Sequence, residues 1–253
     1  MHCLSKPPAY LLISHGSRDV RPQIALEHLA RLVQQAVSAS FPAPLVGTAT
    51  LEFGPTCLTE QIQQFSQQAH TQGCEHVQIL PLFLLPGVHV IEDVPQAVAQ
   101  ARCRLDQTSL RGLKLHLCPY LGCHPGMVRL LKQNLQTHPF STWILLSHGS
   151  RRPQANLVVR SLAEKLGARV AYWSTSPGLE DCLHATPPCA KLGILPYFLF
   201  HGVIVDAIAV KVEQLQTQFQ VELNLLPPLE PTNELVHLIL DCLSSALCCP
   251  AYD

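Results

Sequence analysis

Charged residues are scarce in this chain of 253 residues, and neither sign is in excess. They make up 14% of the sequence, with 17 Lys and Arg against 18 Asp and Glu. No cluster of Lys and Arg stands out, so the sequence lacks the basic surface that nucleic-acid binding requires. We therefore expect no nucleic-acid partner.

Long apolar runs are also missing. The longest, residues 79–85 and 194–200, are too short to span a bilayer as helices, and each contains a proline. Residues 1–8 carry neither an apolar signal core nor an Arg-rich amphipathic pattern. We expect a cytoplasmic protein with no membrane partner, whose 11 cysteines are reduced and mostly buried.

One strand-to-turn element is present twice. Residues 10–18 are YLLISHGSR, and residues 143–151 are WILLSHGSR. In each copy a short apolar run, typical of a strand buried on both faces, ends in Ser-His-Gly-Ser. The glycine permits a tight turn, and the serines can cap a following helix. Each copy therefore places a histidine, His15 or His148, at the carboxyl end of a strand.

Strands and helices are expected to alternate along the chain. In the first half we expect strands at 10–13, 45–51, 76–85 and 113–117. Helices are expected at 21–39, 94–104 and 124–135, and another, capped by Thr56 or Thr59, is expected to run to about residue 71. The second half repeats this order in shortened form, and residues 194–202 match 79–87 without a gap. Such alternation predicts parallel sheets with right-handed crossovers.

The predicted fold is therefore of the α/β class, with two flavodoxin-like half-domains. The N-terminal domain spans residues 1–138 and carries the site, and residues 139–253 form a degenerate repeat. Each is predicted to be a four-stranded parallel sheet flanked by helices, and the two are expected to face each other across a cleft.

Three side chains follow the ends of neighbouring strands in the first half. In a sheet of order 2-1-3-4, the first strand lies between the second and the third. His15, Glu52 and His89 come just after those strands, so we expect them within about 10 Å of one another. Two imidazoles and a carboxylate suit Fe(II), Co(II), Ni(II) or Zn(II), with coordination positions open for substrate.

The second half keeps only part of this set. His148 matches His15, but Ile204 stands opposite His89, and no carboxylate stands opposite Glu52. Residues that served folding alone would be expected in both copies. The first half is therefore predicted to carry the chemistry.

Simpler interpretations stay open for each of these residues. His148 is as readily a hydrogen-bonding turn residue as a ligand, Glu52 can be a solvated turn residue, and His89 can belong to a polar helix start. Glu92 and Asp93 are interpreted as carboxylates at the positive end of the next helix.

Several short motifs follow one another along the chain. They are SHGSR at 14–18, LEFGPT at 51–56, PLFLLPGVHV at 81–90, EDVP at 92–95 and LGCHP at 121–125. Together they resemble the sirohydrochlorin chelatases of the CbiX and SirB class II type, in a long form with two copies. The resemblance implies a lyase that inserts Fe(II), giving sirohaem, or Co(II), giving a cobalamin precursor, with iron preferred. It also assigns metal handling to His15, Glu52 and His89.

The resemblance further implies which molecules bind. The substrates would be sirohydrochlorin, a tetrapyrrole with eight carboxylates, and a divalent metal. Some family members carry an iron–sulfur motif. Here Cys242-x5-Cys248-Cys249 and Cys118-x4-Cys123 are both incomplete, so we predict no cluster.

Hydroxyl and guanidinium groups near two helix starts are candidates for binding the substrate carboxylates. At a helix N-terminus, backbone N–H groups and the helix dipole favour anions. The candidates are Ser14, Ser17, Arg18 and Arg21 in the first half, and Ser150, Arg151 and Arg152 in the second.

Other functions use some of the same features. Neutral His15 and His89 can hold the metal, while Glu52 completes the coordination or accepts a pyrrole proton. A non-enzymatic carrier of metal or tetrapyrrole is the leading alternative, because it could use the same residues. A hydrolase is disfavoured since the G-x-S-x-G nucleophile elbow is missing. The repeat allows a monomer to function alone and does not exclude a homodimer.

Overall fold

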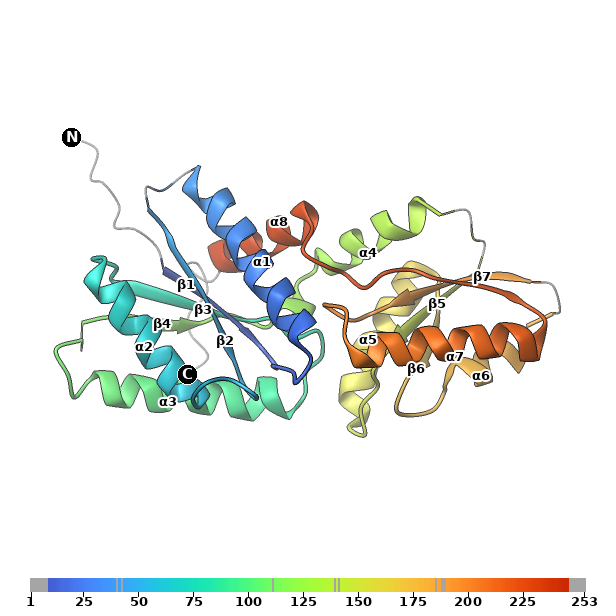
Figure 1. Ribbon diagram of the computed structural model, residues 1–253, viewed down its shortest axis with the longest axis horizontal. Coiled ribbons are helices and arrows are strands. Elements are labelled where there is room, and N and C mark those ends of the chain that lie inside the picture. Colours follow the sequence, from blue (N-terminus) through green and yellow to red (C-terminus); the bar gives the residue numbers. More distant parts are fainter. Residues whose placement is uncertain are drawn as a thin grey trace. The chain divides into compact units, whose positions relative to one another are not determined.

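The computed structural model describes residues 9–245, except for positions 40, 42, 111, 139, 141, 185, 188 and 189. Strands and helices alternate along this part of the chain (Figure 1). Within the described ranges, no helix combines the length and the hydropathy that crossing a membrane requires.

The described part of the first half contains four strands and four α-helices. They are β1 (Ala9–Ser14), α1 (Val20–Ser38), β2 (Leu45–Thr50), α2 (Leu58–Thr71), β3 (His76–Pro81), α3 (Val94–Leu105), β4 (Lys114–Leu117) and α4 (Met127–Gln136). A π-helical turn, η1 (His89–Asp93), leads directly into α3, and a 3₁₀ turn, η2 (Leu121–Cys123), precedes α4.

The second half repeats the order of elements. They are β5 (Thr142–Ser147), α5 (Pro153–Leu166), β6 (Arg169–Tyr172), α6 (Leu179–His184), β7 (Lys191–Pro196), α7 (Val203–Phe219), β8 (Glu222–Leu225) and α8 (Asn233–Ser245).

Each half forms a four-stranded sheet in which the paired strands run parallel. The orders are β2-β1-β3-β4 and β6-β5-β7-β8. In the first sheet Ser14 pairs with Thr50, and Ile13 pairs with Pro81. β1, β2 and β3 therefore end nearly level. The predicted α/β class and the predicted strand order are confirmed.

The packing divides the chain into two compact units whose boundaries differ from those of the sequence repeat. The first unit comprises residues 1–83, 88–124 and 231–253, and the second comprises 84–87 and 125–230. Within the first unit α8 contacts α1 and β3, and within the second α4 contacts α5. The last helix of each repeat, α4 or α8, therefore belongs to the compact unit formed mainly by the other repeat. The expected division after residue 138 follows the boundary of the sequence repeat instead.

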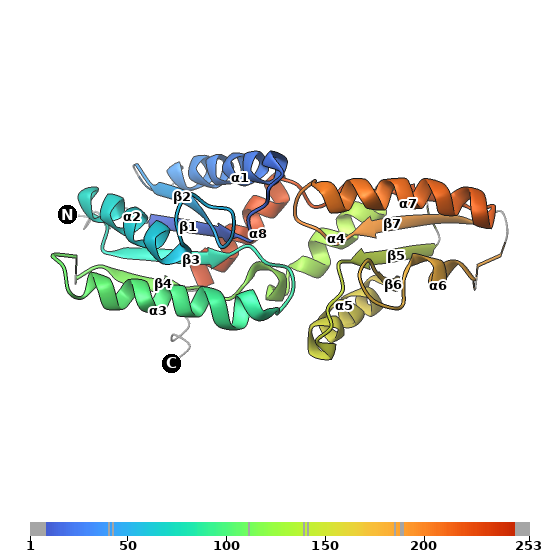
Figure 2. The same ribbon diagram turned by 60° about the horizontal axis from the view of Figure 1, so that its bottom comes forward.

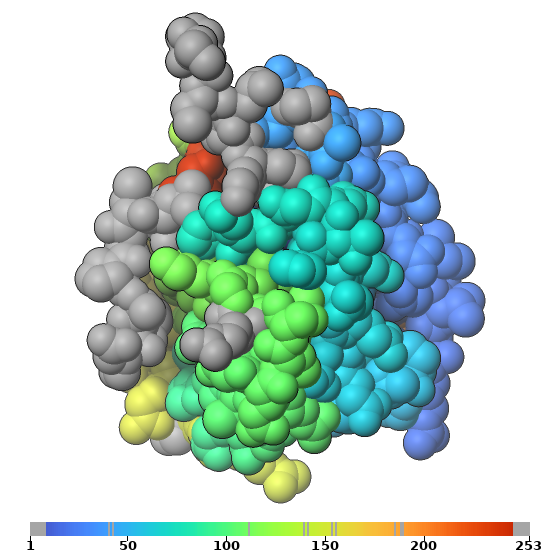
Figure 3. Space-filling model, turned by 90° about the vertical axis from the view of Figure 1, so that its left-hand side faces the viewer, coloured from blue at the N-terminus to red at the C-terminus, as the bar shows by residue number. Residues whose placement is uncertain are grey.

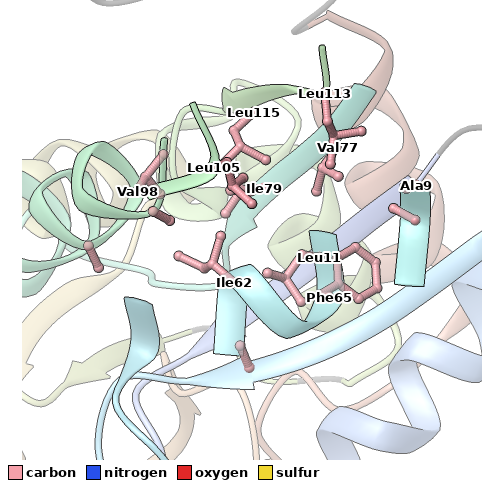
Figure 4. Close-up of a cluster of buried hydrophobic side chains, with 14 of the residues drawn as sticks. Ala9, Leu11, Ile62, Phe65, Val77, Ile79, Val98, Leu105, Leu113 and Leu115 are labelled. Carbon is pink, nitrogen blue, oxygen red and sulfur yellow. The ribbon is translucent and has the colours of Figure 1, made fainter. Parts of the chain in front are cut away.

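Helices cover both faces of the first sheet, with α1 and α8 on one face and α2 and α3 on the other (Figure 2). The core under α2 and α3 is closely packed (Figure 4). Leu11 and Ile79 from the strands meet Ile62 and Phe65 from α2. Alternate residues of each strand therefore face these two helices. In the second unit, Ile144, Leu146 and Ile194 form the equivalent core with residues of α6 and α7.

Two expected elements have different limits. The strand expected to run to residue 85 ends at Pro81, near the level at which its neighbour β1 ends at Ser14. The helix expected from His124 begins at Met127. Pro125 follows His124 and favours the extended backbone seen there, with φ −67° and ψ 129°.

The helix caps also differ from expectation. Asp19, not a serine, caps α1 by accepting from the N–H of Arg21 at 3.0 Å. Ser17 supports this turn, because its Oγ accepts from the N–H of Asp19 at 3.0 Å. α2 begins after Cys57, whose side chain makes no capping bond, so a threonine cap at this helix was wrong.

Candidate metal centre

Two adjoining turns hold His15 beside Glu52. The N–H of Glu52 donates to the carbonyl of His15 at 2.8 Å. Gly16 has φ +89°, and a Cβ built on it would lie 1.9 Å from the carbonyl oxygen of Glu52. Only glycine permits this close approach of the two turns. The chain after β1 and the chain after β2 are therefore in backbone contact at the sheet edge.

His89 reaches the same edge from the end of β3. The N–H of Leu82 donates to the carbonyl of Ile13 at 2.7 Å, which keeps the exit of β3 beside β1. His89 then begins the π-helical turn η1. Such turns often occur at functional sites, where they redirect side chains.

The three side chains converge. His15, Glu52 and His89 each offer one ligand atom, and these atoms all lie within 4.8 Å of one another. The Nε2 atoms of His15 and His89 are 3.1 Å apart, and the rings are T-shaped at 81°. Across the positions that the structure describes, this is the one group of three or more such residues with this geometry.

Hydrogen bonds decide which ring nitrogens face the centre. Nδ1 of His15 lies 3.2 Å from the carbonyl of Gly16, and Nδ1 of His89 lies 2.7 Å from Oδ2 of Asp93. Both oxygens accept, so in the neutral form that binds a metal we assign the proton of each ring to Nδ1. Two Nε2 lone pairs then face each other at 3.1 Å. A divalent cation bound by both would remove their repulsion.

The centre is open to solvent beside a small cavity. His15 and Glu52 are exposed, and His89 is half-buried. The Phe83 ring lies 6.5 Å from the His15 ring and 6.3 Å from the His89 ring. A cavity of about 350 Å³ adjoins the centre and is lined by Leu51, Glu52, His89, Asp93, Gln96, Ala97 and Gln100. A metal can therefore reach the centre from water.

The sequence matches a known family over both repeats. The family model described as CbiX matches residues 9–138 and again residues 142–246. This chain belongs to the CbiX family. The resemblance drawn from the motifs is confirmed.

Curated relatives and solved structures agree with this assignment. The chain is 28% identical to a sirohydrochlorin cobaltochelatase of Priestia megaterium over 230 residues, covering 83% of this chain and 70% of the relative. It is 25% identical to a sirohydrochlorin ferrochelatase of the same organism over 228 residues, covering 84% and 80%.

Two solved structures share the CbiX fold of this chain. SirB from Bacillus subtilis with Fe3+ has a TM-score of 0.76 at 18% identity, and the match covers 95% of each chain. SirB from Bacillus subtilis subspecies spizizenii in complex with cobalt has a TM-score of 0.71 at 19% identity, with the same coverage.

Asp93 has a further role in this CbiX chain beyond the expected position at a helix start. Its side chain makes no capping bond to α3, because η1 continues into that helix without a free N-terminus. Instead its Oδ2 binds Nδ1 of His89, four residues earlier. Asp93 still stands at the N-cap position of α3, and Glu92 lies in the first turn of η1, so both carboxylates lie at a helix start as expected. The bond to His89 was not anticipated, and the His89 to Asp93 spacing was the available signal.

The four candidates for substrate binding in the first unit differ in availability. Arg18 is exposed, and its guanidinium lies 5.3 Å from the centroid of the Phe53 ring. Ser14 ends β1 and is half-buried, and Ser17 is engaged in the α1 cap. Arg21 donates to both carboxylate oxygens of Asp19. These bonds hold the pKa of Asp19 below its usual value, so the pair is ionised and the charge of Arg21 is neutralised.

The second unit holds Ser150, Arg151 and Arg152 at the start of α5. Asn156 fixes this turn, since its Oδ1 accepts from the N–H of Ser150 at 2.9 Å and its Nδ2 donates to the Ser150 carbonyl at 2.7 Å. Arg151 and Arg152 are exposed. The role of Asn156 was not found from the sequence, because its partner is backbone.

The second repeat lacks the carboxylate of the candidate ligand set in space as well as in sequence. The N–H of Ser174 donates to the carbonyl of His148 at 2.9 Å, as Glu52 does to His15. A hydroxyl therefore stands where the first unit has a carboxylate. Loss of hydration lowers the pKa of His148, so its imidazole is neutral at pH 7.

The cysteines near α8 are protected thiols. Burial, followed by the nearby Cys242, raises the pKa of Cys118 to about 12, and burial likewise raises the pKa of Cys242 to about 12. Cys248 and Cys249, which complete the C-terminal pattern, lie outside the described residues.

The raised pKa values of Cys118 and Cys242, together with their burial, predict selective alkylation of exposed thiols. At pH 8 a thiol of pKa about 12 is only about 0.01% thiolate, and the thiolate is the reactive form. Iodoacetamide is expected to modify the exposed Cys57 and Cys103 of the folded protein and to leave Cys118 and Cys242 unmodified. Peptide mass spectrometry checks this. Equal modification of Cys118 and Cys57 would contradict the burial described here.

Proposed function

We propose that this CbiX protein is a sirohydrochlorin chelatase that inserts Fe(II) or Co(II) into the tetrapyrrole. The supporting observation is the pair of Nε2 atoms of His15 and His89, 3.1 Å apart beside the Glu52 carboxylate. The two curated relatives are named for insertion of cobalt and of iron. The donor set suits either metal, because imidazole and carboxylate ligands bind both.

The three side chains hold the incoming metal without enclosing it. His15 and His89 each donate an Nε2 lone pair, and Glu52 supplies a carboxylate oxygen. Three protein ligands leave positions that water occupies first and that ring nitrogens take in turn. Imidazole and carboxylate ligands bind the metal less permanently than thiolates, which favours transfer to the macrocycle.

Insertion also requires two pyrrole protons to leave the ring as the dication enters. Glu52 is the proposed acceptor, because its carboxylate lies at the centre and is exposed to the water that carries the protons away. The overall charge of the macrocycle is then unchanged by the exchange.

Arg18 is the proposed anchor for a substrate carboxylate in this unit. Its guanidinium lies over the ring of Phe53, the residue after Glu52, and it is exposed. Guanidinium groups bind carboxylates with two parallel hydrogen bonds. Ser14 and Ser17 remain proposed contacts, as do Ser150 and Arg151 of the second unit. Arg21 is less available to bind a substrate carboxylate, because its guanidinium is paired with Asp19.

A turnover experiment tests the proposal against the carrier alternative. Sirohydrochlorin and Co(II) or Fe(II) are mixed anaerobically in large excess over the protein, and metallation is followed by absorbance. We expect many product molecules per protein, at a rate proportional to protein concentration. A spectral change limited to one equivalent of protein, with no rate above the protein-free control, would support a carrier instead.

The hydrogen bond from His89 to Asp93 gives a specific prediction for metal binding. Carboxylates that orient a ligating histidine typically contribute about 10-fold to 100-fold to metal affinity. Asp93→Ala is therefore expected to weaken Co(II) binding by about that factor, measured by titration of the Co(II) absorption bands. The control is Glu92→Ala, which removes the neighbouring carboxylate of the same turn. Equal losses in the two variants would mean that general charge, not orientation of His89, is responsible.

A further inference from the structure

A second pair of histidines lies at the opposite end of the first sheet. His76 is the first residue of β3, and His116 lies in β4. Nδ1 of His76 is 3.1 Å from Nε2 of His116, the same separation as between the two histidine nitrogens of the metal centre. The ring centroids are 5.3 Å apart at 32°.

This end of the sheet is a surface of the first unit. Figure 3 views the side of the molecule where the turn before β3 and the turn before β4 lie next to each other. β3 has six residues, so at about 3.3 Å per residue its ends are about 16 Å apart. The metal centre follows the other end of this strand, so the two histidine pairs are separate.

Gln78 shares a sheet face with both histidines. Val77, Ile79 and Leu115 belong to the core under α2 and α3. Because side chains alternate along a strand, His76, Gln78 and His116 point to the opposite face. The register of β3 and β4 places Gln78 directly opposite His116.

The side-chain carbonyl of Gln78 needs a partner. Gln78 is only 4% exposed, and its Oε1 atom has no hydrogen-bond partner among the described residues. Buried polar atoms in folded proteins are nearly always paired. A direct hydrogen bond between His76 and His116 would satisfy the two rings, but it would leave this oxygen unpaired.

We propose that His76, Gln78 and His116 form a second binding site for a divalent transition metal such as Co(II), Ni(II) or Zn(II). The ligand atoms are Nδ1 of His76, Nε2 of His116 and Oε1 of Gln78. Imidazole nitrogen and amide oxygen together suit borderline cations of this kind. The site stands independently of the proposed chelatase activity.

The charges around His116 set the strength of this site. Burial, and then the neighbouring His76 and the positive Arg102 and Lys114, lower the pKa of His116, which keeps it neutral and able to ligate at pH 7. Arg102 is held in place by a 2.6 Å bond to the carbonyl of Leu115. These positive groups and the lack of a carboxylate ligand make the site weaker than the centre containing Glu52. It should therefore fill second.

Metal titration of the full chain tests the proposal. Protein stripped with a chelator is titrated anaerobically with Co(II), and bound metal is counted by calorimetry and by Co(II) absorbance. We expect two equivalents for the wild type, the second of them weaker. His116→Gln is expected to retain only the tighter equivalent, and Glu52→Ala/His89→Ala only the weaker one. The combined variant is expected to bind none.

A matched control and an activity assay separate this site from the metal centre. His70→Gln changes an exposed histidine in the last turn of α2 and is expected to retain both equivalents. His116→Gln is expected to metallate sirohydrochlorin at the wild-type rate. If it does not fold, His76→Gln, at the exposed start of β3, replaces it. A second equivalent that survives in these variants, or that is missing from the wild type up to millimolar Co(II), would overturn the proposal.

Discussion

His15→Ala is expected to slow metal insertion by more than about 100-fold, whereas His148→Ala should retain most of the activity. The two histidines hold equivalent positions after β1 and β5. His15 has His89 and Glu52 within ligand distance, but His148 has Ser174 in place of the carboxylate. Removing His15 deletes a proposed direct ligand, which should exceed the 10-fold to 100-fold effect typical of a residue that only orients one.

Steady-state rates of sirohydrochlorin metallation measure this difference. Thermal unfolding of both variants serves as the control for folding. Each substitution truncates the side chain of a turn residue at the same place in its repeat, so similar effects on stability are expected. Similar rates for His15→Ala and His148→Ala would contradict the assignment of the chemistry to the first unit.

Gly16→Ala is expected to abolish metal binding at the centre. The new Cβ would lie 1.9 Å from the carbonyl oxygen of Glu52, so the turn after β2 would have to move. The backbone at φ +89° adds strain of about 1–2 kcal/mol for a residue with a side chain. Because Glu52 and His15 share this backbone contact, displacement of one turn separates the ligands.

Gly149→Ala is the matched control in the other repeat. Gly149 has φ +83°, so alanine there meets a backbone strain like that at Gly16, but its Cβ would lie 2.6 Å from a side-chain atom, Oγ1 of Thr175, and not against backbone. We expect both variants to lose thermal stability. Only Gly16→Ala is expected to lose Co(II) binding, whereas Gly149→Ala should bind Co(II) with the affinity of the wild type. Loss of binding in both would show that the effect is global instability.

The strand order and the convergence of three ligands could be anticipated from the sequence because both depend on local features. Each apolar run ends in a polar turn, and parallel strands bring such turns to one edge. Gly16 marks the turn, and its φ of +89° shows why glycine is needed there. Likewise, the repeat of YLLISHGSR was sufficient to predict two sheets of the same order.

Features that depend on packing between distant segments were missed. α8 packs on α1 and β3, but the amphipathic pattern of a helix does not identify the sheet that it covers. Asp93 lies among residues typical of a helix start, and the sequence does not show that its carboxylate binds His89 instead of capping α3. Arg21 pairs with Asp19, which is the N-cap residue of α1. The sequence favoured the neighbouring serines as caps, so this pair was not predicted.

The most direct measurement is the initial rate of anaerobic Co(II) insertion into sirohydrochlorin by the wild type and by Glu52→Gln. Glutamine has the size of Glu52 but cannot accept a proton at neutral pH and is a weaker ligand. We predict rapid metallation by the wild type and a rate near that of the protein-free control for Glu52→Gln, with the fold intact. Equal rates for the two proteins would contradict a chelatase centre built from His15, Glu52 and His89.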